Sequence, residues 1–387
     1  MSTLSLKRRR DIARQKWQFI AVIVTVILGV MLFAGSFNAY LNLGTSLERT
    51  YERLVMANFV VAGADDGFVD SAAAIDGIDA AIERRQIDVP VEVGDDAFLG
   101  RIIALPPDGQ PAVNQVDVEE GSYLDPDDRR QVLVETHMAT DFELSVGDAF
   151  VIAGAEVEVA GIVVSPEYLW PARDSQSLFT PPKSFGVMFV HEDVLEGLTS
   201  ATLVEQVLIH YAEGVDENAV DAAVEQAASE ANASSTQTLA KQPSNESINL
   251  EITGLRTMAV AFPLLFLAAA GMAIYVVITR MVYSQRGVIG TLRATGFTSK
   301  ALARHYRSYG LGVGLIGAVI GAILGSLIGR GLTAVYTQIF GIPDLVAELH
   351  LPTVVLALAF GALAGTLASV APARTVARMA PAEAMRG

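Results

Sequence analysis

Few residues of this 387-residue sequence have the types and spacing that catalysis or metal binding requires. The histidines lie far from one another, without the short His or Cys spacing of a zinc site. They are His137, His191, His210, His305 and His350. Two acids follow His191, and acids favour the positive end of a helix, so we interpret this triplet as a helix start. The acidic segment 125–128 resembles part of a calcium loop, but it lacks the Gly and the distal Glu of an EF-hand and is interpreted as a solvated turn.

Motifs for nucleophilic catalysis and for phosphate binding are also missing from the sequence. It contains no G-x-S-x-G and no G-x-x-x-x-G-K-[ST] loop. The absence of cysteine excludes disulfides, thiolate-bound metals and thiol nucleophiles. We therefore expect a non-catalytic chain that binds no cofactor and no metal of its own.

Charge divides the sequence into two kinds of segment. Residues 45–253 hold 39 Asp or Glu and 10 Lys or Arg, a balance of −29, whereas the remainder holds 4 acids and 17 bases, a balance of +13. The acidic part would repel phosphates, so a nucleic-acid partner is disfavoured. Hydrophobic residues make up 51% of the chain, which argues against wholesale disorder.

Four apolar segments are long enough to cross a bilayer. A helix needs about 20 apolar residues to span the hydrocarbon core. The predicted transmembrane helices are 17–44, 257–279, 308–330 and 351–373. They lack the polar stripe of a helix in a soluble core.

The flanking basic residues predict the orientation of these helices. Six Lys or Arg lie in the N-terminal segment 1–16, six in segment 280–307 and three in the tail 374–387, whereas the short loop 331–350 has none. Cytoplasmic loops collect Lys and Arg, so we expect both termini and 280–307 inside a prokaryotic cell and residues 45–256 outside. A cleaved signal peptide is the alternative for the N-terminus. We favour an uncleaved helix, because the apolar stretch is long and no convincing A-x-A site follows it.

The outer segment 45–256 is predicted to be an α+β domain with a β-rich insertion. Strands at 58–62, 204–210 and 235–239 and a helix at 216–231 predict an α+β portion made of 58–87 and 204–240. Segment 70–86 is Ala-rich and amphipathic, and we expect it to be helical. Between them, 88–203 reads as short strands broken by Gly and Asp.

One loop of this domain, 165–186, carries large side chains among four prolines. Such residues on an irregular loop anchor an extracytoplasmic protein partner or cover a neighbouring strand layer, and the sequence does not separate the two. The candidate partner residues are Tyr168, Leu169, Trp170 and Phe179.

Segment 280–307 is predicted to form a short amphipathic helix, with a break at 296–299 and Ser299 as the cap of the next helix. A partner protein can push against such a helix, or the helix can simply touch anionic membrane lipid. In the third span, glycines recur every fourth residue, a spacing that lets helix backbones approach closely in lipid. The candidate packing residues are Gly317, Gly321, Gly325 and Gly329, with Gly361 and Gly365 in the fourth span.

The connector QRGVIGTLRATGFTSKAL resembles that of the FtsX/MacB-type ABC transporter permeases. The end of the chain, APARTVARMAPAEAMRG, is similar to the terminal signature of that family, as is the order of one span, a large outer domain and three spans. The matching connector residues are Arg286, Ile289, Gly290, Leu292, Arg293, Ala294 and Gly296. The matching tail residues are Pro372, Pro381, Glu383 and Arg386. Val288 stands where the family has Glu, which removes an expected polar contact with the ATPase.

This resemblance implies that a separate cytoplasmic ATPase, which binds ATP and Mg²⁺, docks on the connector. It implies a second permease copy or paralogue in the membrane, and an outer domain with a ferredoxin-like porter portion and a β-rich insertion. The expected function is coupling of ATP hydrolysis to movement of the outer domain, for export or extraction of an amphiphile or for mechanotransmission. The alternative is a regulatory or scaffold protein that controls a cell-wall enzyme or senses a ligand.

Overall fold

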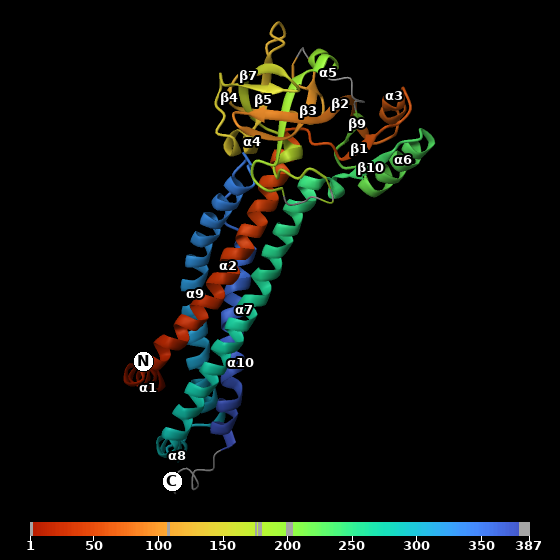
Figure 1. Ribbon diagram of the computed structural model, residues 1–387. Coiled ribbons are helices and arrows are strands. Elements are labelled where there is room, and N and C mark those ends of the chain that lie inside the picture. The colour runs from red at the N-terminus through yellow and green to blue at the C-terminus, as the bar shows by residue number, and fades with distance from the viewer. Residues whose placement is uncertain (1–2, 107–108, 175, 177–179, 199–203, 379–387) are drawn as a thin grey trace. The chain divides into compact units, whose positions relative to one another are not determined.

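The computed structural model describes residues 3–106, 109–174, 176, 180–198 and 204–378 (Figure 1). The chain forms two compact units. The helical unit comprises Met1–Gly44, Ile252–Val335 and Val346–Gly387. The α/β domain comprises Thr45–Glu251 and Tyr336–Leu345.

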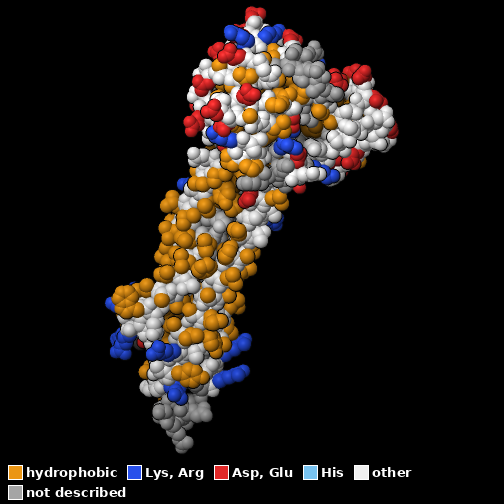
Figure 2. Space-filling view, in the orientation of Figure 1, with side chains coloured by type: hydrophobic (Ala, Val, Ile, Leu, Met, Phe, Trp, Pro, Cys, Tyr) orange, Lys and Arg blue, Asp and Glu red, His pale blue; other side chains and the backbone are white. Residues whose placement is uncertain are grey.

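Long helices make up the helical unit, and four of them are long and apolar enough to cross a membrane. These four are α2 (Lys16–Arg53), α7 (Pro243–Ser284), α9 (Ser299–Ile339) and α10 (Leu351–Arg378). Two short helices, α1 (Thr3–Arg14) and α8 (Arg286–Ala294), precede α2 and α9. On the face shown in Figure 2, hydrophobic side chains gather along the long helices and Lys and Arg gather near one end of them. This exposed apolar surface is what a lipid-covered bundle presents.

Glycines decide how closely the helices of this unit approach. A Cβ added at Gly317, Gly321, Gly325 or Gly329 of α9 would lie 2.7 to 2.9 Å from the nearest atom of α2. Gly361 and Gly365 of α10 instead face α9, and a Cβ at Gly365 would lie 2.1 Å from the Gly310 carbonyl oxygen. One set of α9 glycines, at 317, 321, 325 and 329, therefore packs against α2 of the same chain. Another α9 glycine, Gly310, packs against α10.

The first part of the α/β domain is a ferredoxin-like unit. Its elements are β1 (Phe59–Ala62), α3 (Phe68–Ala73), β2 (Ile78–Val93), β9 (Val204–Tyr211), α6 (Glu217–Glu230) and β10 (Ser235–Thr238). The four strands pair antiparallel in the order β10-β1-β9-β2, and α3 and α6 pack on one face of this sheet. The buried faces of α3, α6, β1 and β9 supply the core between helices and strands.

The insertion between β2 and β9 closes into a barrel. It contains β3 (Asp96–Leu105), β4 (Asp117–Gly121), β5 (Gln131–Glu135), α4 (Thr136–Asp141), β6 (Ala149–Ile152), β7 (Ala155–Val164), η1 (Pro166–Tyr168), β8 (Phe185–His191) and α5 (Glu192–Leu198). Pairing runs β2-β3-β8-β5-β7-β6 and returns from β6 to β2. Alternate residues of these strands, such as Val89, Ile102 and Val134, fill the interior. Closure leaves the six ring strands without free edges, which stabilises a β-rich unit.

The helix expected over 70–86 is wrong for most of its length. Helix α3 ends at Ala73, and β2 begins at Ile78 and runs sixteen residues through the Ala-rich segment. Gly77 has a φ of +93°, a backbone conformation that residues with a side chain rarely adopt, and it marks the turn between α3 and β2. Pairing with β9 on one side of β2 then outweighs the helix propensity of alanine.

Candidate functional site

Helix α8 is the centre of the predicted coupling segment. Ile289 is fully buried in the core of the helical unit, and Gly290 is buried beside it. Leu292 and Arg293 are half-buried, whereas Arg286 and Ala294 are exposed. The structure therefore divides the predicted coupling residues into an anchoring side and an exposed side. Only the exposed side can meet a partner.

Two turns set the direction of α8. Gln285 separates it from α7, and Gly296 follows its end with φ of +97°. The Phe297 amide donates to the Leu292 carbonyl (3.1 Å) and the Gly296 amide to that of Arg293 (3.1 Å), which is a Schellman motif. The cap of α9 is Thr298, whose Oγ1 accepts from the Ala301 amide (3.2 Å), and the expectation of a Ser299 cap was wrong by one residue.

A partly buried polar cluster connects α1 to the α7–α8 turn. Lys7 Nζ donates to both Asp11 Oδ2 and Gln285 Oε1, and the Tyr306 hydroxyl donates to the same Gln285 oxygen (2.9 Å). The Tyr309 hydroxyl donates to Asp11 Oδ2 (2.8 Å). Burial raises the pKa of Asp11, but the hydrogen bonds from Lys7 and Tyr309 and the charge of Lys7 outweigh burial and lower it overall. Asp11 is therefore ionised, and its hydrogen bonds hold α1 against α9. The sequence pattern did not predict this cluster.

The exposed surface of α8 is partly apolar. Val288 is 49% exposed. Arg286 lies over the Tyr283 ring at 5.8 Å, and its Nε donates to the Tyr283 carbonyl (3.3 Å). The exposed side of α8 therefore presents a valine beside a guanidinium that is held against Tyr283, where the family pattern has a glutamate.

In the α/β domain, the segment that follows α9 fits against the predicted aromatic loop. Phe340 is 2% exposed and makes an edge-to-face contact with Trp170, with 5.9 Å between ring centroids. Tyr168 and Leu169 are buried within the domain. Of the predicted partner residues, these three thus contact the chain's own domain, and Phe179 lies outside the described residues.

His137 and Arg53 hold the same segment. Gly341, with φ of +62°, approaches the His137 ring so closely that an added Cβ would lie 3.1 Å from it. Asp344 accepts from Arg53 Nε (2.9 Å). Burial lowers the pKa of His137, but the charge of Glu135 and its hydrogen bond to His137 Nδ1 (2.9 Å) outweigh burial and raise it overall. Segment 336–345 is therefore an integral part of the α/β domain.

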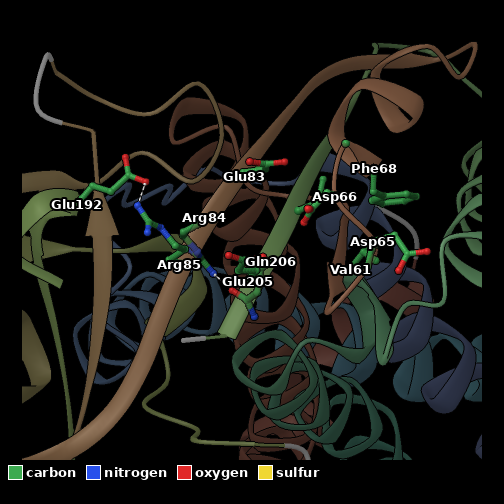
Figure 3. Close-up of a pocket in the computed structure, with 13 residues that line it drawn as sticks. Val61, Asp65, Asp66, Phe68, Glu83, Arg84, Arg85, Glu192, Glu205 and Gln206 are labelled. Atoms are coloured by element: carbon green, nitrogen blue, oxygen red, sulfur yellow. Dashed lines mark hydrogen bonds and ion pairs between the residues drawn. The ribbon is translucent and has the colours of Figure 1, made fainter. Parts of the chain in front are cut away.

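Two ion pairs form an ionic seam between the ferredoxin-like unit and the barrel, and Figure 3 shows its surroundings. On β2, Arg84 donates through both terminal nitrogens to Glu167, and Arg85 donates to Glu192 of α5 (2.6 Å). Arg84 also donates to Gln206 Oε1 of β9 (2.8 Å). Burial lowers the pKa of Arg84, but the charge and hydrogen bonds of Glu167 raise it overall. The Arg84 guanidinium therefore stays charged.

Arg84 and Gln206 line two cavities, of about 360 Å³ and about 200 Å³. Acidic side chains such as Asp65, Asp66 and Glu205 line the larger one. Among the described residues, no group of three or more His, Asp or Glu could hold a metal ion.

The remaining predicted residues belong to the tail. Pro372 is buried within α10. Pro381, Glu383 and Arg386 lie outside the described residues.

Two family models match the chain. A MacB-like periplasmic core domain matches residues 19–227, which is more than half of the 387 residues, and an FtsX-like permease C-terminal domain matches residues 260–381. No curated protein matches the chain significantly.

Solved domains of two such transporters are similar to part of the chain. The extracellular domain of the noncanonic ABC-type transporter YknZ from Gram-positive bacteria is 13% identical, with a TM-score of 0.32, over 46% of this chain and 89% of that one. The periplasmic region of MacB from Actinobacillus actinomycetemcomitans is 12% identical, with a TM-score of 0.32, over 52% of this chain and 95% of that one. By the two family matches, the chain belongs to the FtsX/MacB family of ABC transporter permeases.

Proposed function

We propose that the chain is the membrane subunit of an ABC system in which a separate cytoplasmic ATPase drives movement of the α/β domain. ATP and Mg²⁺ bind to that partner. Its closure presses on the exposed side of α8, which carries Arg286, Val288 and Ala294. The helical unit conveys the displacement, and this chain contributes no catalytic group.

The continuity of three helices carries this proposal. Each of α2, α7 and α9 is a single helix whose residues belong to both units. A continuous helix resists bending, because its backbone hydrogen bonds would have to break. A shift applied near α8 therefore has an unbroken route to residues of the α/β domain.

The basic ends of the helical unit support an orientation with both termini and α8 in the cytoplasm. The α/β domain is then outside the cell membrane. A second permease copy or a paralogue is the proposed neighbour in the bilayer, where large apolar side chains such as Leu265 of α7 and Leu327 of α9 are about two-thirds exposed (67% and 66%).

The chemistry of the spans favours transmission of movement, or handling of an amphiphile at the outer leaflet, over passage through a pore. No Asp, Glu, Lys or Arg lies deep within the four predicted spans. Pores and proton-driven carriers use ionisable groups at such positions. A regulatory role for the outer domain is the second candidate, because that domain contains two cavities with the volume for a ligand.

Charge reversal on α8 tests the coupling. We expect Arg286→Glu combined with Val288→Lys to reduce permease-stimulated ATP turnover by the co-purifying ATPase at least about tenfold, since a docking residue contributes about 1.4 kcal/mol or more. Both side chains are exposed, so folding should be retained. Arg378→Glu is the matched control, an exposed charge at the end of α10 that should leave turnover within about twofold. Unchanged turnover and co-purification in the double variant would refute docking on α8.

A further inference from the structure

We infer that an open groove between α9 and α10 binds an anionic phospholipid, with the lipid phosphate at Arg330 and an acyl chain along the groove. This groove, the lipid groove, is lined by residues of the helical unit alone. Its lining is apolar apart from Arg330 and one serine of α9. The apolar side chains include Ile323 and Leu327 of α9, Leu349 before α10, and Leu358 of α10.

Arg330 is the one charged residue that lines the lipid groove, and its side chain is exposed. It is also the only Lys or Arg between Arg307 and Arg374. No hydrogen bond, ion pair or ring contact joins Arg330 to any other residue that the structure describes. A guanidinium is always protonated in proteins. Arg330 is therefore a positive charge on α9 that the chain itself does not compensate.

The surroundings of Arg330 are those of a residue that faces lipid. Leu327, one turn before it, is 66% exposed, and Ile323 is 65% exposed. A charge among lipid-facing apolar side chains is costly, but a long arginine side chain can extend to the membrane interface. Arg330 is the last residue of the predicted span 308–330, so that interface is within its reach. Phospholipid phosphates lie at the interface, and a guanidinium binds a phosphate through paired hydrogen bonds.

The charges of the spans favour a lipid over a second permease copy as the occupant. The four predicted spans contain no Asp or Glu. The spans of a second copy would therefore cover Arg330 without giving it a carboxylate, and a buried charge without a partner is strongly unfavourable. A second copy is better placed on another face of the helical unit, such as that of Leu265 on α7.

The lining also distinguishes between kinds of phosphate. A free phosphate ion has no apolar part to cover the leucines and isoleucine of the lipid groove. A zwitterionic phospholipid carries its own ammonium group, and no Asp or Glu lines the groove to attract that group. An anionic phospholipid supplies both an acyl chain and a net negative charge. In the proposed orientation this lipid belongs to the outer leaflet.

Fluorescence quenching of the full-length protein in lipid nanodiscs tests the site. The chain has no cysteine, so Val355→Cys allows a single bimane label to be attached. Val355 is 64% exposed and follows Val354, which lines the lipid groove. The quenchers are phosphatidylglycerol and phosphatidylcholine with the same nitroxide-labelled acyl chain, so their ratio is independent of label depth. We expect phosphatidylglycerol to be preferred about fivefold, which corresponds to about 1 kcal/mol for one arginine near an anionic lipid.

Arg330→Gln should reduce this preference to within about twofold of equal quenching, whereas Arg330→Lys should retain most of it, because lysine keeps the charge. Arg330 is exposed, so both variants should fold. The matched control is a label at Leu265→Cys on α7, a site of similar exposure (67%). There the two lipids should quench within about twofold of each other, with or without Arg330→Gln.

Equal quenching by the two lipids at Val355→Cys would overturn the assignment, as would a preference that Arg330→Gln leaves unchanged. Quenching by neither lipid at Val355→Cys, with quenching by both at Leu265→Cys, would overturn it too and would show that protein covers the lipid groove. None of these measurements involves an ATPase, so they are independent of the coupling test.

Discussion

The helical unit and the α/β domain hold their elements together by opposite means. In the helical unit, contact between helices depends on the absence of side chains at glycines of α9 and α10. In the α/β domain, the ferredoxin-like unit and the barrel share β2, and two long charged side chains of this strand, Arg84 and Arg85, pair with acids of the barrel. Lipid gives no hydrophobic gain for burying leucine between helices, whereas close backbone contact gains dispersion energy there. In the water-exposed α/β domain, an ionic contact also restricts the orientation of the ferredoxin-like unit relative to the barrel.

This difference suggests different mechanical roles. Backbone contacts between helices are short and leave little room for sliding. The ionic seam is bordered by two cavities, which give its side chains room to rearrange. We expect the helical unit to transmit movement as a rigid body. We expect the orientation between the ferredoxin-like unit and the barrel to be adjustable.

Breaking the seam should have the largest effect. Arg84→Met leaves the Glu167 side chain, which is 11% exposed, without its partner, and we expect a loss of about 3–4 kcal/mol in the free energy of unfolding of the α/β domain. Denaturant titration followed by tyrosine and tryptophan fluorescence measures this loss. The control is Arg129→Met, whose pair with Asp193 is exposed and should contribute less than about 1 kcal/mol. Equal losses in the two variants would show that burial of the seam pair has no special effect.

Adding one methyl group between helices should have the next largest effect. A Cβ at Gly314 would lie 2.2 Å from the Gly361 carbonyl oxygen, so Gly314→Ala must push α9 from α10 and should cost about 1–3 kcal/mol. At Gly312, two residues away on the same helix, no atom lies within 4 Å of such a Cβ. Gly312→Ala should therefore be neutral or slightly stabilising. Thermal unfolding in nanodiscs compares the two variants, and similar unfolding temperatures would contradict the packing described for α9.

The smallest effect should be a pH dependence at His137. Its pKa is raised in the folded domain, so the folded state holds this proton more tightly than the unfolded chain does. The added stability is fully present below pH about 6.5, the ordinary value for histidine, and is lost as pH rises through the raised pKa. We expect the free energy of unfolding to decrease on going from pH 6 to above the raised pKa.

Replacement of His137 by Gln should remove this component of the pH dependence, because Gln cannot bind the proton. Unfolding measured at several pH values on both proteins provides the comparison. An unchanged pH profile in His137→Gln would show that another group controls it.

Local patterns accounted for much of the architecture but not for the contacts that define the candidate sites. Hydrophobic length located the helices, and turn residues located most strands of the insertion. The same patterns failed at 78–86, where pairing between β2 and β9 decides the conformation of an Ala-rich segment. The family resemblance also placed Gly290 and Leu292 among the coupling residues, without separating the anchoring side of α8 from its exposed side.

The sequence by itself determined the four apolar helices, the acidic domain between the first two and the family of the chain. Each of these properties depends on residues that are adjacent or regularly spaced along the chain. Only the tertiary structure decided that α9 glycines meet both α2 and α10, that Trp170 meets Phe340, and that Arg84 and Gln86 line one pocket. Such contacts join residues far apart in sequence, and their geometry follows from strand pairing and helix packing rather than from local propensity.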